Sequence, residues 1–241
     1  MSGPADPPGP TSGVARDEHG RPRAATTHDV TVLDGGAGDG DAPLRALGRS
    51  TALAPARAGA DVRAAAATVL GARVVLAGPA VPEEALAAAA ELCTGLLVLR
   101  PAARPLPLAL RRRVDLLVVG LVDLAALAGE VDRPGDLEDV VARARALRPD
   151  QTSVVVGAGG GAVVVTPGGH AAVPLSATAA GEEFADGLVD GLLGGLGLVD
   201  AVRWAGHVAT RAVGAAHRGG PPHRDEVGPT RVLPPTGGST P

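Results

Sequence analysis

The chain has 241 residues, which is enough for one α/β domain with a hydrophobic core. Its net charge of -4, single Phe, single Trp and lack of Tyr exclude the basic surface and aromatic platforms of nucleic-acid-binding proteins. Cys93 is the only cysteine, which excludes an intramolecular disulfide and a cysteine-cluster metal site. The first 23 residues lack the apolar segment of a secretory signal, and no apolar run is long enough to span a membrane. We therefore expect a cytoplasmic protein that binds neither nucleic acid nor a membrane.

Both ends of the chain have the composition of disordered segments. Residues 1–28 are rich in Pro, Gly and mixed charge, with few large apolar side chains, and residues 219–241 repeat this composition. Such segments cannot bury enough apolar surface to offset the entropy of ordering. We expect one folded domain over residues 29–218, flanked by two disordered segments.

Apolar runs and amphipathic segments alternate along the first part of this domain. Short apolar runs predict strands over residues 29–33, 72–77, 96–99 and 114–119. Helical periodicity predicts helices over residues 44–47, 61–70, 82–92, 121–127 and 136–147. Pro82 and the two acids after it form a start signal, and Gly129 forms a stop signal. Continuous apolar strands separated by helices predict a mostly parallel central sheet with helices on both faces.

The pattern changes in the last third of the domain. Glycine-containing turns separate three short apolar segments, which predict strands over residues 152–156, 162–166 and 170–174. These strands form a C-terminal β-meander. Two helices then complete the domain, over residues 182–193 and 199–217.

A glycine-rich loop lies within this meander, with glycines at Gly157, Gly159, Gly160 and Gly161. Its spacing is superficially that of a dinucleotide-binding fingerprint, but that fingerprint must open a helix. The residues that follow Gly161 predict a strand, so we reject a Rossmann site. A hairpin turn and a loop that contacts a nucleotide both remain open. A Walker-type loop is excluded because the chain has no Lys.

The His residues, the arginine cluster and Trp204 do not have the spacing of a catalytic motif. The six His residues are scattered, and we expect His207 to be a surface or half-buried residue of the last helix rather than a catalytic base. We interpret the arginines at positions 111–113 as a solvated face. Trp204 has helical spacing from apolar and basic neighbours, which predicts a position at the edge of the core.

A tight turn of small residues precedes the helix expected at residue 182. The turn contains Ala179, Ala180 and Gly181, and Glu182 and Glu183 follow it. The start of a helix can bind an anion, and a carboxylate beside it is the layout that phosphoryl transfer requires. The alternative is that the two acids only complement the helix dipole.

The order of these elements and several local motifs resemble the ribokinase/PfkB-type carbohydrate kinases. Residues 72–86 resemble the strand that leads into a helix with a Pro-x-Glu opening, and residues 97–107 resemble the strand that ends in an Asn-Pro-Ala-type stretch. Residues 114–129 resemble the strand and helix that carry an Asn-x-x-Glu motif. The turn before residue 182 lies where the family has Asp-Thr-x-Gly-Ala-Gly-Asp-x-Phe, with Phe184 matching. A weaker similarity relates residues 35–48 and 59–61 to the family's double-glycine segment.

This resemblance implies a ribokinase-like fold and transfer of the γ-phosphoryl group of ATP to a sugar hydroxyl, with Mg²⁺. Glu182 would replace the catalytic Asp, and Ala179, Ala180 and Gly181 would form the phosphate-binding turn. The implied nucleotide loop contains the four glycines of residues 157–161. Asp123 would approach the metal through a water, and Gly35 and Gly36 would contact the substrate. The resemblance also implies a homodimer formed through a lid strand.

Several residues depart from the family pattern. Gly120 stands in place of the Asn of the Asn-x-x-Glu motif, Asp123 in place of its Glu, and Ala179 in place of a Gly. The early substrate-binding Asp and the complete lid are not found. Two alternatives therefore stay open: a pseudokinase that binds a nucleotide or a protein partner without turnover, and a fragment of a longer gene product.

Overall fold

The computed structural model describes residues 15–16, 22–23, 28–36, 42–129, 136–147, 152–158, 160–176 and 181–218. Two short strands, β1 (Ala15–Arg16) and β2 (Pro22–Arg23), pair with each other in an antiparallel ribbon. The remaining strands form one eight-stranded sheet in the order β10-β9-β8-β7-β6-β5-β3-β4. The fold is α/β, as the sequence predicts.

Six neighbouring strands of this sheet are parallel, and they are joined by helical connections. They are β4 (Thr51–Pro55), β3 (His28–Asp34), β5 (Ala72–Ala77), β6 (Leu96–Leu99), β7 (Leu116–Gly120) and β8 (Ser153–Ala158). The sheet ends in an antiparallel meander of β8, β9 (Gly161–Thr166) and β10 (Gly169–Pro174). The predicted parallel sheet and C-terminal meander are both confirmed.

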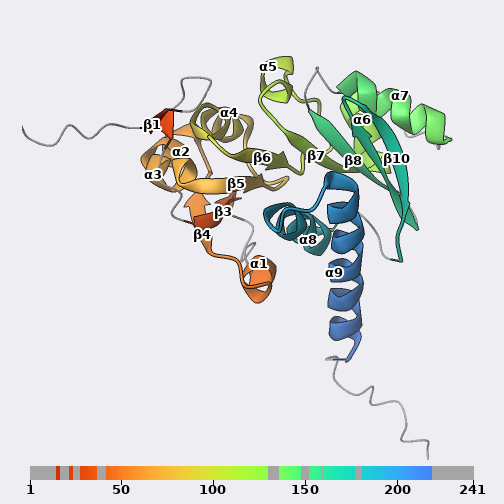
Figure 1. Cartoon of the computed structure of the whole chain (residues 1–241). Helices are drawn as coiled ribbons and strands as arrows, with labels where there is room; N and C mark the ends of the chain where they lie inside the picture. Colours follow the sequence, from red (N-terminus) through yellow and green to blue (C-terminus); the bar gives the residue numbers. More distant parts are fainter. Residues whose placement is uncertain are drawn as a thin grey trace, which may run out of the picture.

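Helices cover both faces of the sheet (Figure 1). One face packs against α2 (Gly59–Ala64), α3 (Ala66–Leu70), α4 (Glu83–Leu92), α5 (Leu108–Arg111), α6 (Leu121–Ala128) and α7 (Leu137–Leu147). The other face packs against α1 (Ala42–Ala46), α8 (Glu182–Leu193) and α9 (Leu198–Arg218). Residues 74–77 of β5 are continuously apolar because the strand is buried on both faces: Val75 faces the first core, while Val74 and Leu76 face the second.

The structure differs from the sequence prediction between residues 48 and 71. An additional strand, β4, forms one edge of the sheet, and the helix predicted over residues 61–70 is interrupted at Ala65, which has φ -91° and ψ 20°. Only Ala54 of β4 is buried, so the strand lacks an apolar pattern that would identify it. Pro55 is tolerated at its end because an edge strand needs fewer ladder hydrogen bonds. By contrast, Gly129 has φ 74° and ends α6, as predicted.

Helices α8 and α9 pack closely because two glycines of α8 face α9. A Cβ atom at Gly187 would lie 2.9 Å from both Ala205 Cα and Val208 Cβ. A Cβ atom at Gly191 would lie 3.0 Å from Ala201 Cα. The two helix backbones can approach only where these side chains are absent.

We expect the substitution Gly187→Ala to destabilise the fold by about 1–2 kcal/mol, because the added methyl group overpacks the α8–α9 contact. Urea unfolding followed by circular dichroism measures this loss. Gly197→Ala is the matched control, since nothing lies within 4 Å of the position of its Cβ atom. Equal stability of the two variants would contradict the packing argument.

No helix in the described ranges is both long and apolar enough to cross a membrane.

Candidate active site

A cavity of about 200 Å³ lies where β3, β5 and β6 reach their carboxyl ends. Ligand sites of open α/β sheets lie at this edge. Apolar side chains form much of the wall, including those of Val32, Leu53, Leu76, Pro79 and Val81. Four charged residues complete the lining: Asp34, Arg100, Glu182 and Asp186.

Gly35 forms part of the wall through a close backbone contact. A Cβ atom at this position would lie 2.5 Å from the Ala80 carbonyl oxygen and 2.7 Å from the Ala80 carbonyl carbon. Only glycine therefore lets the end of β3 contact the segment after β5. Gly36 follows with φ 97°, and its N–H donates to Asp34 Oδ1 at 2.7 Å. Of the two predicted substrate glycines, Gly35 lines the cavity and Gly36 supports the adjacent turn.

The start of α8 contributes two carboxylates to this cavity. Glu182 and Asp186 are four residues apart, so both lie on one face of the helix. Their exposure differs strongly: the Glu182 side chain is 70% exposed, whereas Asp186 is 2% exposed. Glu182 therefore lies at the mouth of the cavity, whereas Asp186 is almost completely covered by the surrounding protein.

Arg100 connects the end of β6 to the start of α8. Its backbone N–H donates to the carbonyl oxygen of Ala77 at 2.9 Å, which extends the β5–β6 pairing. Its side chain is 18% exposed, and Nη1 lies 3.7 Å from Glu182 Oε1. The guanidinium group thus offsets the charge of Glu182 at the mouth of the cavity.

Gly181 is the N-cap residue of α8, with φ -75° and ψ 174°, and contributes no side-chain cap. The predicted Ala179 and Ala180 of the same turn lie outside the described residues. Glu182 and Glu183 both lie in the first turn of the helix, where acids complement the positive end of the dipole. The interpretation that these acids complement the helix dipole is therefore sufficient for Glu183. Glu182 also lines the cavity.

The predicted nucleotide loop and Asp123 lie elsewhere along the same edge of the sheet. Asp123 is in the first turn of α6, after β7, and does not line the cavity. Gly157 lies near the end of β8 and pairs with Gly120 of β7. Gly160 lies in the β8–β9 hairpin turn and Gly161 begins β9, so the loop opens a strand, as the rejection of a Rossmann site requires.

This hairpin turn borders a shallow depression of about 280 Å³. Gly160 has φ 78°, and a Cβ atom at Gly161 would lie 2.9 Å from the carbonyl oxygen of Val173. Both glycines therefore have a structural reason to be present. Gly159 lies outside the described residues. Whether the turn contacts a nucleotide stays a prediction.

Three charged cavity residues, Asp34, Arg100 and Asp186, were not identified as site residues from the sequence. Asp186 follows Glu182 at helical spacing, and that spacing could have revealed it. Arg100 directly follows a predicted strand, at the edge where ligands bind in parallel sheets. Tertiary packing brings α8 to the ends of β3, β5 and β6, and no local sequence pattern predicts this packing.

The described ranges contain no group of three or more His, Cys, Asp or Glu residues that could hold a metal ion. The residues around the cavity thus do not form a complete protein site for Mg²⁺.

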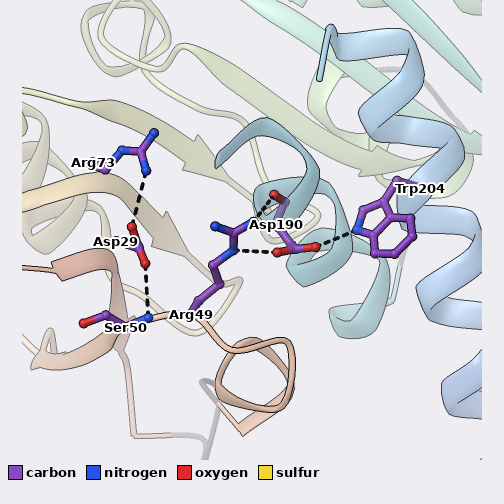
Figure 2. A network of polar contacts seen from close by, with 6 residues as sticks. All are labelled: Asp29, Arg49, Ser50, Arg73, Asp190 and Trp204. Atoms are coloured by element: carbon purple, nitrogen blue, oxygen red, sulfur yellow. Dashed lines mark hydrogen bonds and ion pairs between the residues drawn. The ribbon is translucent and has the colours of Figure 1, made fainter. Parts of the chain in front are cut away.

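Polar contacts of Asp190, which lies two turns after Glu182, anchor α8 beyond its first turns (Figure 2). Arg49 Nε donates to Asp190 Oδ1 at 2.5 Å, and Trp204 Nε1 donates to Asp190 Oδ2 at 2.7 Å. Arg49 Nη2 also donates to the backbone oxygen of Asp190 at 2.9 Å. Asp190 is 7% exposed, so this carboxylate ties α8 to α9 and to the segment before β4. Trp204 lies at the edge of the core, as predicted.

Solved structures share this arrangement of sheet and helices. A PfkB protein from Polaromonas is 26% identical, with a TM-score of 0.51 over 68% of this chain and 62% of that chain. A pyridoxal kinase from Bacillus subtilis is 16% identical, with a TM-score of 0.59 over 84% of this chain and 96% of that chain. The chain has a ribokinase-like fold. A phosphomethylpyrimidine kinase from Clostridium difficile shares this ribokinase-like fold at 14% identity, with a TM-score of 0.59 over 76% of this chain and 99% of that chain.

The matches differ in how much of the known protein this chain covers. The chain spans 62% of the length of the Polaromonas protein, but nearly the whole length of the phosphomethylpyrimidine kinase and of the pyridoxal kinase. No protein-family model and no curated protein sequence matches the chain.

Proposed function

We propose that the chain is an ATP-dependent phosphotransferase that acts on a hydroxyl group of a small sugar-like acceptor. One observation carries this proposal: Glu182, Asp186 and Arg100 converge on a cavity at the carboxyl ends of the parallel strands of a ribokinase-like fold. The cavity is the acceptor site in this proposal. ATP would bind beside it, with its phosphates at the start of α8.

The start of α8 supports the phosphate side of the proposal. Backbone N–H groups and the dipole favour an anion at this end of a helix. Glu182 and Glu183 would repel a polyphosphate, but Arg100 lies 3.7 Å from Glu182 and reduces that repulsion. Arg100 therefore keeps the helix start accessible to a γ-phosphate. Asp123 and the hairpin turn at Gly157, Gly160 and Gly161 would lie on the nucleotide side.

The size and lining of the cavity support a small acceptor. A volume of about 200 Å³ is below the roughly 300–1,000 Å³ typical of sites for drug-sized ligands. A pentose or a single heteroaromatic ring with a hydroxymethyl group matches this size better than a nucleoside does. The similar proteins include a kinase named for pyridoxal, which is a single heteroaromatic ring with a hydroxymethyl group. Mg²⁺ would arrive with the phosphates of ATP, because the described residues form no metal cluster.

We expect acceptor-dependent release of ADP when the protein is incubated with Mg-ATP and a panel of small alcohols. The panel contains D-ribose, pyridoxal and 4-amino-5-hydroxymethyl-2-methylpyrimidine, and a coupled ADP assay measures turnover. The reaction without acceptor is the control, because it reports hydrolysis of ATP alone. ADP release that no acceptor stimulates would contradict the proposed function.

The pseudokinase alternative retains one structural argument, because Glu182 is both exposed and paired with Arg100. Under either interpretation, we expect Mg-ATP to raise the thermal unfolding midpoint. Ligand at 100 times its Kd stabilises the folded state by about 2.7 kcal/mol. Differential scanning fluorimetry with and without Mg-ATP measures this shift. A shift without turnover supports the pseudokinase, and no shift at millimolar ATP leaves only a structural or partner-binding role.

A further inference from the structure

Asp34 is a cavity residue to which the sequence resemblance assigns no role. It is the last residue of β3, and it is half-buried. Val30 and Val32 of the same strand belong to the core that α8 covers, and the side chains of a strand alternate between its two faces. The side chain of Asp34 therefore points to the face of the sheet that carries α8 and the cavity.

Arg100 lies on the same face, on the far side of Gly78 from Asp34. One row of laterally paired residues crosses β3, β5 and β6, and it contains Val32, Leu76 and Val98. Two residues further along each strand, the corresponding row contains Asp34, Gly78 and Arg100. Neighbouring strands lie about 4.8 Å apart, so the backbones of Asp34 and Arg100 are separated by about 10 Å.

Gly78 leaves open space between these two charged residues. Nothing lies within 4 Å of the position of its Cβ atom. The apolar side chains of Leu53 and Leu76 border the same cavity. A single ring of an acceptor can therefore lie over Gly78, with one end toward Asp34 and the other end toward Arg100.

The two ends of this space differ in their chemistry. At one end, Arg100 Nη1 lies 3.7 Å from Glu182 Oε1, at the start of α8 where the phosphates are proposed to bind. At the other end, Asp34 Oδ1 accepts a hydrogen bond from the Gly36 N–H at 2.7 Å, which fixes the carboxylate. Among the described residues, Asp34 Oδ2 has no hydrogen-bond partner. A carboxylate oxygen only accepts hydrogen bonds, so Oδ2 can bind a hydroxyl or ammonium group.

Building on the proposed function, we infer that Asp34 selects and orients the acceptor by binding a second hydroxyl or amino group, on the side of the ring away from the hydroxyl that reacts. The acceptor class is therefore a compact ring with donor groups on two sides, either a diol or an amino alcohol. A phosphate or carboxylate at the second position is disfavoured, because its negative charge would face Asp34.

The first test is Asp34→Asn, with steady-state kinetics on the panel acceptor that gives the highest turnover. Asn keeps an oxygen for the Gly36 N–H but presents an NH₂ donor in place of Oδ2. We expect kcat/KM for the acceptor to fall by about 10- to 100-fold, the loss typical of a hydrogen bond to a charged group, and the KM for ATP to stay unchanged. Asp29→Asn is the matched control, because Asp29 lies at the opposite end of β3 and does not line the cavity.

Analogues of that acceptor separate a bond to the substrate from a structural effect. Each analogue has hydrogen in place of one hydroxyl or amino group other than the reacting hydroxyl, as 2-deoxy-D-ribose and 3-deoxy-D-ribose do for D-ribose. We expect the wild-type protein to discriminate against one analogue by about 10- to 100-fold, and Asp34→Asn to lose this discrimination. A merely structural role for Asp34 would lower the rate with every acceptor by the same factor and preserve the discrimination.

A variant of the cavity floor tests the position of the ring. Gly78→Ala places a methyl group in the open space between Asp34 and Arg100. We expect the KM for the acceptor to rise while the KM for ATP stays unchanged. An unchanged KM for the acceptor would mean that the ring does not lie over Gly78.

Two further results would overturn the assignment. One is an Asp34→Asn variant that discriminates between the acceptor and its analogues as the wild type does. The other is a wild-type protein that uses every analogue as well as the parent acceptor; this result needs no variant and decides alone if circular dichroism shows that Asp34→Asn does not fold. A wild-type protein without acceptor-dependent turnover would instead refute the proposed function itself, which distinguishes the two failures.

Discussion

Replacing Asp190 with Ala lowers the free energy of unfolding by about 2–4 kcal/mol in our expectation, because it removes the acceptor of two charge-assisted hydrogen bonds. Arg49 and Trp204 donate to opposite oxygens of this carboxylate at 2.5 and 2.7 Å (Figure 2). The Arg49 side chain is only 23% exposed, so its charge would stay largely buried with no carboxylate and with only the backbone oxygen of residue 190 as a partner. Urea unfolding measures the loss. The fluorescence of Trp204, the only Trp in the chain, reports the same site.

The matched control for this prediction is Asp200→Ala. Asp200 pairs with Arg203 on α9 at 2.5 Å, but both side chains are more than half exposed. Exposed pairs of this kind contribute about 0–1 kcal/mol, so the control should unfold almost like the wild type. A double-mutant cycle with Arg49→Met isolates the coupling between Arg49 and Asp190. Zero coupling, or equal losses for Asp190→Ala and Asp200→Ala, would contradict the role of the network.

This network also bears on the candidate active site, because the same helix carries the anchor and the cavity acids. Asp190 is one turn beyond Asp186 and two turns beyond Glu182 on α8. The anchor fixes α8 against α9 and against the segment before β4, while the first turns of the helix face the cavity. The position of the two cavity acids therefore depends on contacts made elsewhere along the helix.

The sequence predicted most of the fold because its strong local patterns agree with the final packing. The apolar run that forms β5 and the acids that open α4 are such patterns, and both elements have nearly the predicted bounds. The strand β4 was missed because a run of Ala and Pro with one buried residue has no strand periodicity. The break at Ala65 was missed because it lies in a run of Ala residues that carries no helix stop signal.

The candidate site was predictable only where a motif marked it. Glu182 was identified because a turn of small residues precedes it, and Gly35 because its glycine pair resembles the double-glycine segment of the ribokinase/PfkB-type kinases. Arg100 and Asp186 carry no motif, and their importance comes from the approach of α8 to the ends of separate strands. The residue types were visible in the sequence, but the topology that brings them together was not.

Gly35→Ala should impair binding of the acceptor more than binding of ATP. The new Cβ atom would lie 2.5 Å from the carbonyl oxygen of Ala80, and a backbone atom cannot move aside as a flexible side chain can. The segment after β5 must shift, which changes the wall of the cavity. We expect the KM for the acceptor to rise by about 10-fold or more, since one misplaced ångström can cost as much as about 100-fold in rate. Steady-state kinetics with each substrate varied in turn measures this change.

The stability of the same variant tests the clash independently of catalysis. Overpacking of this kind costs about 1–3 kcal/mol, and urea unfolding measures that loss. Gly78→Ala is the matched control for unfolding, because Gly78 lines the same cavity but has nothing within 4 Å of its Cβ position. If Gly35→Ala and Gly78→Ala unfold alike, the close contact with Ala80 does not constrain the wall. If the variant loses stability while the acceptor KM stays at its wild-type value, this wall does not bind the acceptor, and the acceptor site lies elsewhere.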